Sequence, residues 1–360
     1  MPIGIILVRW DDRVGTIVEA KYPPDVRADP DLAMKIYGAH VLGERGPGFL
    51  MMKVDNLNIA SYYSGVELNY FVALIMAPDE EASIFEEGLT EVAGEIFTRV
   101  VKKEGKKALK ELYPQLVRFP TLTLEQRIAL IFSDPTRAQI LDYLTREGNS
   151  TKSDLEDLLK RVLKLKAINI DAVLSALIKM GMVTTEWVEG LPTECVFLKR
   201  DAFLIRVPPR NTIEKIRNGN IMEPLASRYM DEVTKYFEKY EPNQKDIKQI
   251  SQVLTVPDFY DVLDSLRNSQ ILRTQLPIVL NRSKNEIEKA VREMIKQKFI
   301  ASLKDDDGRE WLFLKTDPRI ITFYPEYCVQ IAAEKYNNKE IPPRQAMRHL
   351  LILKENHREM

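Results

Sequence analysis

The strongest constraint on the fold is that the second part of the sequence contains one pattern twice. Residues 175–209 are SALIKMGMVTTEWVEGLPTECVFLKRDAFLIRVPP, and residues 289–325 are KAVREMIKQKFIASLKDDDGREWLFLKTDPRIITFYP. The run Phe-Leu-Lys at residues 197–199 recurs at residues 313–315, which is 116 residues further along. Because a fixed interval marks a repeated structural unit, we expect two copies of one fold in this part of the chain.

The local signals in the first copy predict three short helices and a β-hairpin. Asp134 and Pro135 are typical of a helix start, and Gly148 of a helix end. Thr151 and Asn169 precede two further segments with apolar residues at helical spacing. The segments MVTTEWV and CVFLKRDAFLIRV flank the turn EGLPTE and favour two paired strands.

Three helices followed by a two-stranded wing resemble a winged helix-turn-helix domain. The segments TRAQILDYL and SALIKMGMV resemble the ArsR-like repressors in particular. We therefore predict winged helix 1 over residues 122–209 and, from the repeat, winged helix 2 over residues 245–325. Ser283 and Glu286 form the S-x-x-E pattern of a capping box at the start of the third helix in the second copy.

The first 98 residues favour the element order β-β-α-β-β-β-α. This order, with the opening GIILVRWDDRVGTIVEA, resembles longin domains and the related roadblock modules. The resemblance implies a five-stranded antiparallel sheet, and a role in dimerisation or in contacts with small GTPases or scaffolds. The predicted fold class is α+β, with this domain over residues 1–98. A longin-like domain joined to ArsR-like domains resembles archaeal proteins.

The remaining segments are predicted to be helical. They are a basic linker helix over residues 99–121, a connecting helix over residues 210–244 and a C-terminal helical tail over residues 326–360. Within the connecting helix, apolar residues alternate at intervals of three and four, as in a short coiled-coil seam. The seam either packs within the chain or forms a dimer contact, and the candidate contact residues are Met230, Val233, Phe237 and Tyr240.

The charge distribution limits the class of partner. A formal net charge of −1 excludes a uniformly basic coat for nucleic acid. Residues 1–98 carry 7 Lys and Arg against 16 Asp and Glu, so this domain is acidic and the remainder is mildly basic. The acidic domain suits a basic protein partner, and its resemblance implies a small GTPase as another.

Three predicted helices carry the cationic residues that nucleic acid requires. In a winged helix the third helix enters a groove and the wing contacts the backbone, but both wings here are acidic and oppose phosphate. The candidates therefore lie on the linker helix, on the second helix of the first copy and on the third helix of the second copy. The candidate nucleic-acid-binding residues are Lys102, Lys103, Lys106, Lys107, Lys160, Arg161, Lys164, Lys166, Lys284, Asn285, Lys289, Arg292 and Lys296.

No motif for catalysis, a metal or a cofactor is found. The sequence lacks the G-x-x-x-x-G-K-[ST] phosphate loop, and Cys195 and Cys328 fit neither a metal spacing nor a disulfide framework. His349 and His357 lie two turns apart on a predicted helix without a partner ligand, so we expect packing or surface histidines. We expect a non-enzymatic protein without a cofactor.

The predicted function is that of a dimeric winged-helix transcription regulator that binds DNA. The alternatives are an adaptor bound to the ribosome or another ribonucleoprotein through RNA, dimerising through its N-terminal domain, and a scaffold for a small GTPase or for membrane remodelling. The N-terminal apolar run is too short for a signal peptide, and no run approaches the ~20 apolar residues of a membrane span. We therefore expect a cytoplasmic protein without membrane insertion.

Overall fold

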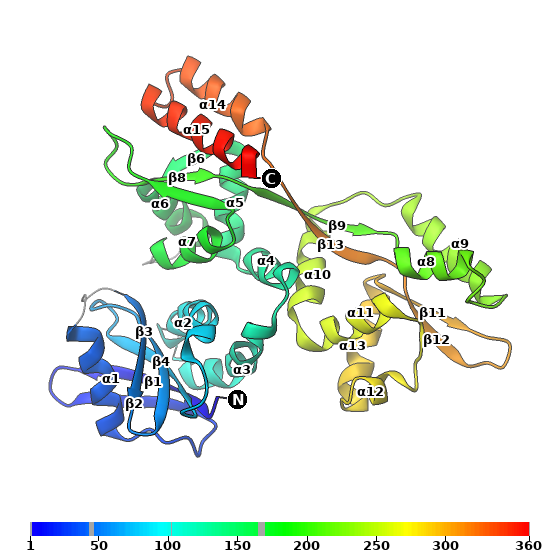
Figure 1. Ribbon diagram of the computed structural model, residues 1–360, viewed down its shortest axis with the longest axis horizontal. Helices are drawn as coiled ribbons and strands as arrows, with labels where there is room; N and C mark the ends of the chain where they lie inside the picture. The colour runs from blue at the N-terminus through cyan, green and yellow to red at the C-terminus, as the bar shows by residue number, and fades with distance from the viewer. Residues whose placement is uncertain (1, 43–46, 102, 165–169, 360) are drawn as a thin grey trace. The chain divides into compact units, whose positions relative to one another are not determined.

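The computed structural model consists of helices and strands that form two compact units (Figure 1). The first unit comprises residues 1–122 with 171–176, and the second comprises residues 123–170 with 177–360. Within these units the structure describes residues 2–42, 47–101, 103–164 and 170–359. Among the residues described, no helix is sufficiently long and apolar to cross a membrane.

The first unit is built on one antiparallel sheet with the order β2-β1-β5-β4-β3. Its strands are β1 (Gly4–Asp11), β2 (Gly15–Tyr22), β3 (Gly48–Val54), β4 (Leu57–Tyr63) and β5 (Tyr70–Met76). The five-stranded antiparallel sheet and the order of its elements were predicted from the sequence and are confirmed.

Helices cover both faces of this sheet, which explains why β1 is an almost continuous apolar run. Ile5 and Leu7 join one cluster with α2 (Glu86–Val101) and α3 (Gly105–Arg118). Ile6 and Val8 point to the opposite face, because successive side chains of a strand alternate, and join a cluster with α1 (Pro30–Leu42). The predicted basic linker helix is therefore part of this domain, since one face of α3 is buried in its core.

Residues 123–360 pass through one order of elements twice. The first series is α4 (Leu124–Ser133), α5 (Pro135–Glu147), β6 (Asn149–Thr151), α6 (Lys152–Leu163), α7 (Ile170–Lys179), β7 (Val183–Glu186), β8 (Cys195–Leu198), β9 (Asp201–Val207), α8 (Arg210–Arg217) and α9 (Leu225–Phe237). The second series is α10 (Gln244–Thr255), α11 (Pro257–Asn268), β10 (Ile271–Leu272), α12 (Leu276–Val279), α13 (Lys284–Lys296), β11 (Ile300–Lys304), β12 (Glu310–Leu314), β13 (Asp317–Phe323), α14 (Tyr327–Asn337) and α15 (Pro343–Glu359). We call these two series repeat 1 and repeat 2.

Each repeat forms a small antiparallel sheet with the same strand order, β6-β8-β7 in repeat 1 and β10-β12-β11 in repeat 2. The hairpin predicted between MVTTEWV and CVFLKRDAFLIRV is partly correct: β7 pairs with β8, but β8 ends at Leu198 and β9 begins as a separate strand at Asp201. β9 does not pair with β7 but with β13 of the other repeat, over the full length of both strands. The sequence pattern could not distinguish these two pairings, since both bury alternate residues.

The β9–β13 pair has an internal two-fold relation. Leu204 pairs with Ile320 at its centre, and these residues are equivalent positions of the two repeats, 116 residues apart. Asp201 pairs with Phe323, and the same offset converts this pair into Asp317 with Val207 at the opposite end. The two strands therefore cross as equivalent partners (Figure 1).

The helices after each crossing strand pack on the other repeat. Tyr229 of α9 lies in a cluster with Phe313 of repeat 2, and its hydroxyl donates to the Leu314 carbonyl at 2.8 Å. His349 of α15 contacts Phe197 of repeat 1 and donates from Nε2 to the Leu198 carbonyl at 3.1 Å. Leu198 and Leu314 are equivalent residues, so in each repeat the same backbone carbonyl accepts a hydrogen bond from a helix of the other repeat. Each repeat thus completes its core with helices from the other.

The apolar seam of the connecting helix packs within the chain, which was one of its two predicted roles. Val233 is buried, and Met230 and Phe237 are partly buried in the cluster that includes Ala301 and Phe313 of repeat 2. The remaining seam residue is Tyr240, whose hydroxyl accepts a hydrogen bond from the Arg206 backbone amide at 3.1 Å. The apolar face of α9 is therefore covered by repeat 2 of the same chain.

We predict that His349 makes the stability of the second unit depend on pH. Burial lowers the pKa of His349 to about 4, against an unfolded value of about 6.5. Below pH 6.5 the unfolded chain therefore binds a proton that the folded chain excludes, and stability falls as the pH falls toward 4. We expect H349Q to remove about 2 kcal/mol of the stability difference between pH 7 and pH 5, measured by urea unfolding. The exposed His357 provides the control, because H357Q should leave that difference unchanged.

Candidate functional site

The predicted cationic face of repeat 2 lies on α13. Ile287, Ala290, Val291 and Met294 are buried on one side of this helix. The opposite side is exposed and carries all five candidate residues, Lys284, Asn285, Lys289, Arg292 and Lys296. Spacings of four, three and four residues from Asn285 onward place four of these side chains along one stripe. The arrangement leaves their charges available to a polyanion.

Two of the cations on this stripe also contact acidic residues of the same helix. Arg292 Nε lies 3.1 Å from Glu288, and Lys296 Nζ lies 3.7 Å from Glu293. Both cations are largely exposed, so these pairs contribute little to stability and can be exchanged for a phosphate partner.

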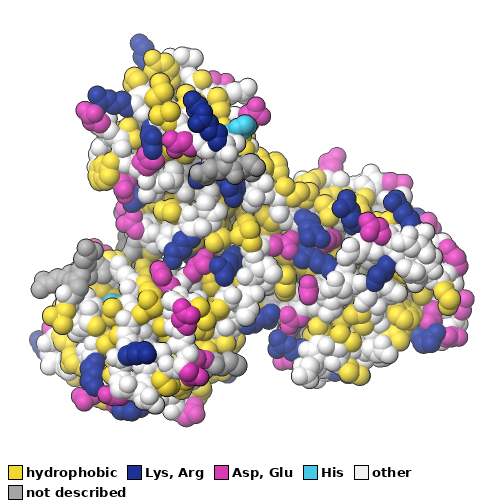
Figure 2. All heavy atoms as spheres, in the orientation of Figure 1, with side chains coloured by type: hydrophobic (Ala, Val, Ile, Leu, Met, Phe, Trp, Pro, Cys, Tyr) yellow, Lys and Arg dark blue, Asp and Glu magenta, His cyan; other side chains and the backbone are white. Residues whose placement is uncertain are grey.

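The other candidate residues lie on separate elements. In repeat 1, Arg161 and Lys164 are exposed at the end of α6, and Lys160 lies 2.6 Å from Glu156. In the first unit, Lys103, Lys106 and Lys107 are exposed on or beside α3. Lys102 and Lys166 lie outside the described residues. Figure 2 shows Lys and Arg interspersed with Asp and Glu on the visible face rather than separated by sign.

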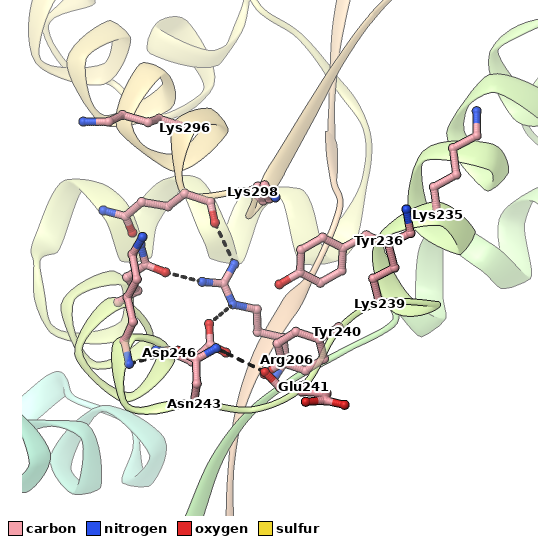
Figure 3. A pocket seen from close by; sticks show the side chains of 13 residues that line it. Arg206, Lys235, Tyr236, Lys239, Tyr240, Glu241, Asn243, Asp246, Lys296 and Lys298 are labelled. Atoms are coloured by element: carbon pink, nitrogen blue, oxygen red, sulfur yellow. Dashed lines mark hydrogen bonds and ion pairs between the residues drawn. The ribbon is translucent and has the colours of Figure 1, made fainter.

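A pocket of about 330 Å³ opens beside the C-terminal end of α13 (Figure 3). Its walls come from β9, from the end of α9 and the following connection, from the start of α10 and from the turn after α13. Six cationic side chains line it against two acidic ones. The cations are Arg206, Lys235, Lys239, Lys245, Lys296 and Lys298.

Of these six residues, only Lys296 was predicted from the sequence. The other five come from distant segments of the chain, from Arg206 on β9 to Lys298 after α13, which the crossing of β9 brings together. The one local signal is the segment KYFEKYEPNQK from Lys235 to Lys245, in which Lys-Tyr pairs recur at an interval of four residues.

Arg206 forms the floor of the pocket and connects its walls. Its Nε donates to Asp246 at 2.8 Å, its NH1 to the Gln297 carbonyl at 2.7 Å and its NH2 to Gln249 at 2.6 Å. The guanidinium also lies 4.0 Å from the ring centroid of Phe299. Figure 3 shows this guanidinium at the centre of the lining residues. Because Arg206 neutralises Asp246, the pocket retains the charge of its lysines.

The rim of the pocket combines exposed lysines with tyrosines that stay protonated. Lys235, Lys239 and Lys298 are exposed. Burial raises the pKa of Tyr236 to about 12, and its ring stacks on that of Tyr240 with centroids 5.4 Å apart. The pocket therefore offers ammonium groups and neutral hydroxyl groups, both of which donate hydrogen bonds to anionic oxygens.

Other chemistry-bearing side chains are structural. Cys195 and Cys328 are both buried, and burial raises the pKa of each thiol to about 12. In the ranges that the structure covers, no three His, Cys, Asp or Glu side chains converge on a possible metal position. No protein-family model matches the sequence, and the comparison with curated proteins finds no match.

We predict that R206A destabilises the second unit strongly. The side chains of Arg206 and Asp246 are only 2% and 7% exposed, so removal of the guanidinium leaves a buried carboxylate without its partner. Such a loss costs about 3–5 kcal/mol. Urea unfolding measures the change, and K239A, which removes an exposed cation of the same pocket, should change stability by less than about 0.5 kcal/mol. Equal effects of the two variants would contradict the structural role of Arg206.

Proposed function

We propose that the protein is a non-enzymatic, nucleic-acid-associated regulator that contacts phosphates through the exposed face of α13. The observation that carries the proposal is the stripe of Asn285, Lys289, Arg292 and Lys296, all exposed on a helix whose other side is buried. Lysine and arginine bind phosphate by charge, and asparagine adds the amide that can pair with a base edge.

The order of elements in repeat 2 supports a winged-helix interpretation. The helices α11, α12 and α13 precede the antiparallel pair β11–β12, and a short β10 joins that pair. In a winged helix the element equivalent to α13 enters a groove, and the loop equivalent to residues 305–309 contacts the adjacent backbone. The cationic stripe therefore lies on the element that this fold uses for recognition.

The acidic wing of repeat 2 opposes phosphate less than its sequence suggests. Arg309 Nε lies 2.8 Å from Asp305, and its NH2 lies 2.6 Å from Asp307. Two of the three aspartates in this loop are therefore paired within it. The pairing does not change the net charge of the segment KDDDGRE, but it places the Arg309 guanidinium against two of its carboxylates.

Repeat 1 presents a different surface at the equivalent helix. Asp171 and Lys179 are exposed on α7, where repeat 2 has its cationic stripe. This difference supports the adaptor alternative for repeat 1, in which its third helix contacts a protein. The two proposals are compatible in one chain, with repeat 2 on nucleic acid and repeat 1 on a protein of a ribonucleoprotein or transcription complex.

We predict that K289A/R292A weakens binding to nucleic acid and reduces its salt dependence. Each lost phosphate contact lowers the slope of log K against log salt by about 1, so the double variant should lose about 2. Fluorescence anisotropy with a labelled 30-base-pair duplex and a 30-nucleotide RNA measures both quantities across a salt series. K354A/R358A removes two exposed cations from α15 and should behave as the wild type.

Two results would refute this proposal. One is the absence of any binding tighter than about 10 µM at physiological salt, which is weaker than specific nucleic-acid sites. The other is an equal loss in K354A/R358A, which would indicate general attraction by net charge.

A further inference from the structure

We propose that the lysine-rimmed pocket beside α13 binds a small metabolite that carries two or more phosphoryl groups. The proposal goes beyond nucleic-acid binding, because it concerns a concave site and not the exposed stripe of α13. A volume of about 330 Å³ lies in the size range of small-ligand sites. The six cations and two acids that line it leave a positive excess inside a confined space.

The rim lysines are available to such a ligand. Lys235, Lys239, Lys245 and Lys298 are exposed, and in the described ranges none of them has an ion pair within 4.0 Å. The buried acid of the pocket, Asp246, is occupied by Arg206 at 2.8 Å. Only Glu241 opposes an incoming anion without such a partner in the pocket.

The lysines surround the pocket rather than one edge of it. Figure 3 shows Lys235 and Lys296 on opposite sides of Arg206, extending from α9 and from the end of α13. Lys245 is contributed by α10. Charges distributed in this way match a ligand whose phosphoryl groups are several ångströms apart, and not a single monovalent anion.

The duplication provides an internal comparison for these positions. The hydrogen bonds of Tyr229 and His349 to equivalent carbonyls align α9 with α15 at an offset of 120 residues. At this offset Lys235 corresponds to Glu355, which reverses the charge, and Tyr236 corresponds to Asn356. At the position of Lys235 the same scaffold therefore carries a cation in one copy and an acid in the other, so the fold itself does not require a lysine there.

Lys298 provides a second, independent indication. Its φ of +64° is close to the +67° of Gly181, the equivalent residue of repeat 1. Both residues donate the same turn hydrogen bond, from Lys298 to Ile295 and from Gly181 to Ile178, each at 2.9 Å. A left-handed conformation is strained for lysine and unstrained for glycine. Repeat 2 therefore keeps a lysine in this conformation at a position whose side chain lines the pocket, where repeat 1 has a glycine.

The glycine of repeat 1 suggests a variant that separates binding from folding. K298G removes one rim cation and relieves the left-handed strain, so the thermal midpoint should stay at or above that of the wild type. Calorimetric titration of the full chain with ATP, with inorganic tripolyphosphate and with adenosine, at constant ionic strength, tests the site. We expect ATP and tripolyphosphate to bind and adenosine to fail. K298G and K239E should each weaken binding at least tenfold, whereas K354E should not.

The outcomes distinguish a small ligand from nucleic acid. If tripolyphosphate competes with ATP, and if K298G leaves binding of the 30-base-pair duplex unchanged, the pocket is a separate small-ligand site. The proposal is overturned if ATP and tripolyphosphate do not bind, if adenosine binds as well as ATP, or if K298G leaves their affinities unaltered. It is also overturned if K298G weakens only duplex binding, because the pocket would then belong to the nucleic-acid surface. None of these results depends on whether K289A/R292A alters nucleic-acid binding.

Discussion

The pairing of β9 with β13 determines the arrangement of the whole second part of the chain. Seven residue pairs hold these two strands together, with Leu204 opposite Ile320 at the centre. Each strand leaves its own repeat after a short three-stranded sheet and carries two helices to the other repeat. Without this pairing, α9 and α15 would lose the surfaces that bury Tyr229 and His349. The crossing therefore couples two cores that the sequence encodes separately.

This coupling has an energetic consequence. Helices exchanged between repeats bury apolar residues against a sheet that is more than 80 residues away in the chain, as with Tyr229 and Leu314. Neither repeat can complete its core from its own segment, because its last two helices belong to the other core. The two repeats are therefore expected to unfold together, since loss of one core removes the support of the other. Arg206 strengthens this link, because it lies on the crossing strand and bonds to α10 and to the turn after α13.

Much of the local structure was predictable, because it follows from short-range chemistry. The Asp134 side chain accepts from the amides of Thr136 and Arg137, Pro135 begins α5 and Gly148 ends it with a φ of +75°, as predicted. Ser283 likewise caps α13. The exchange was not predictable, because CVFLKRDAFLIRV has the same alternation whether it continues a hairpin or crosses to another strand. On the candidate site, the sequence identified the residues on exposed helix faces, such as Lys289.

The pocket depends on contacts between distant segments, so its main residue, Arg206, gave no local signal.

Duplication also separates what the fold requires from what function has added. Positions that hold the two repeats together keep their role in both, as Leu198 and Leu314 do as acceptors for the exchanged helices. Two positions that line the pocket do not keep their residue type, because Lys235 corresponds to Glu355 and Lys298 corresponds to Gly181. Of the pocket lysines, Lys298 occupies a left-handed backbone position, and all five of them line one cavity. The specialised chemistry of this chain therefore lies on the core of repeat 2 together with the strand and helix that repeat 1 contributes to it, and the cationic stripe of α13 and the pocket meet at Lys296.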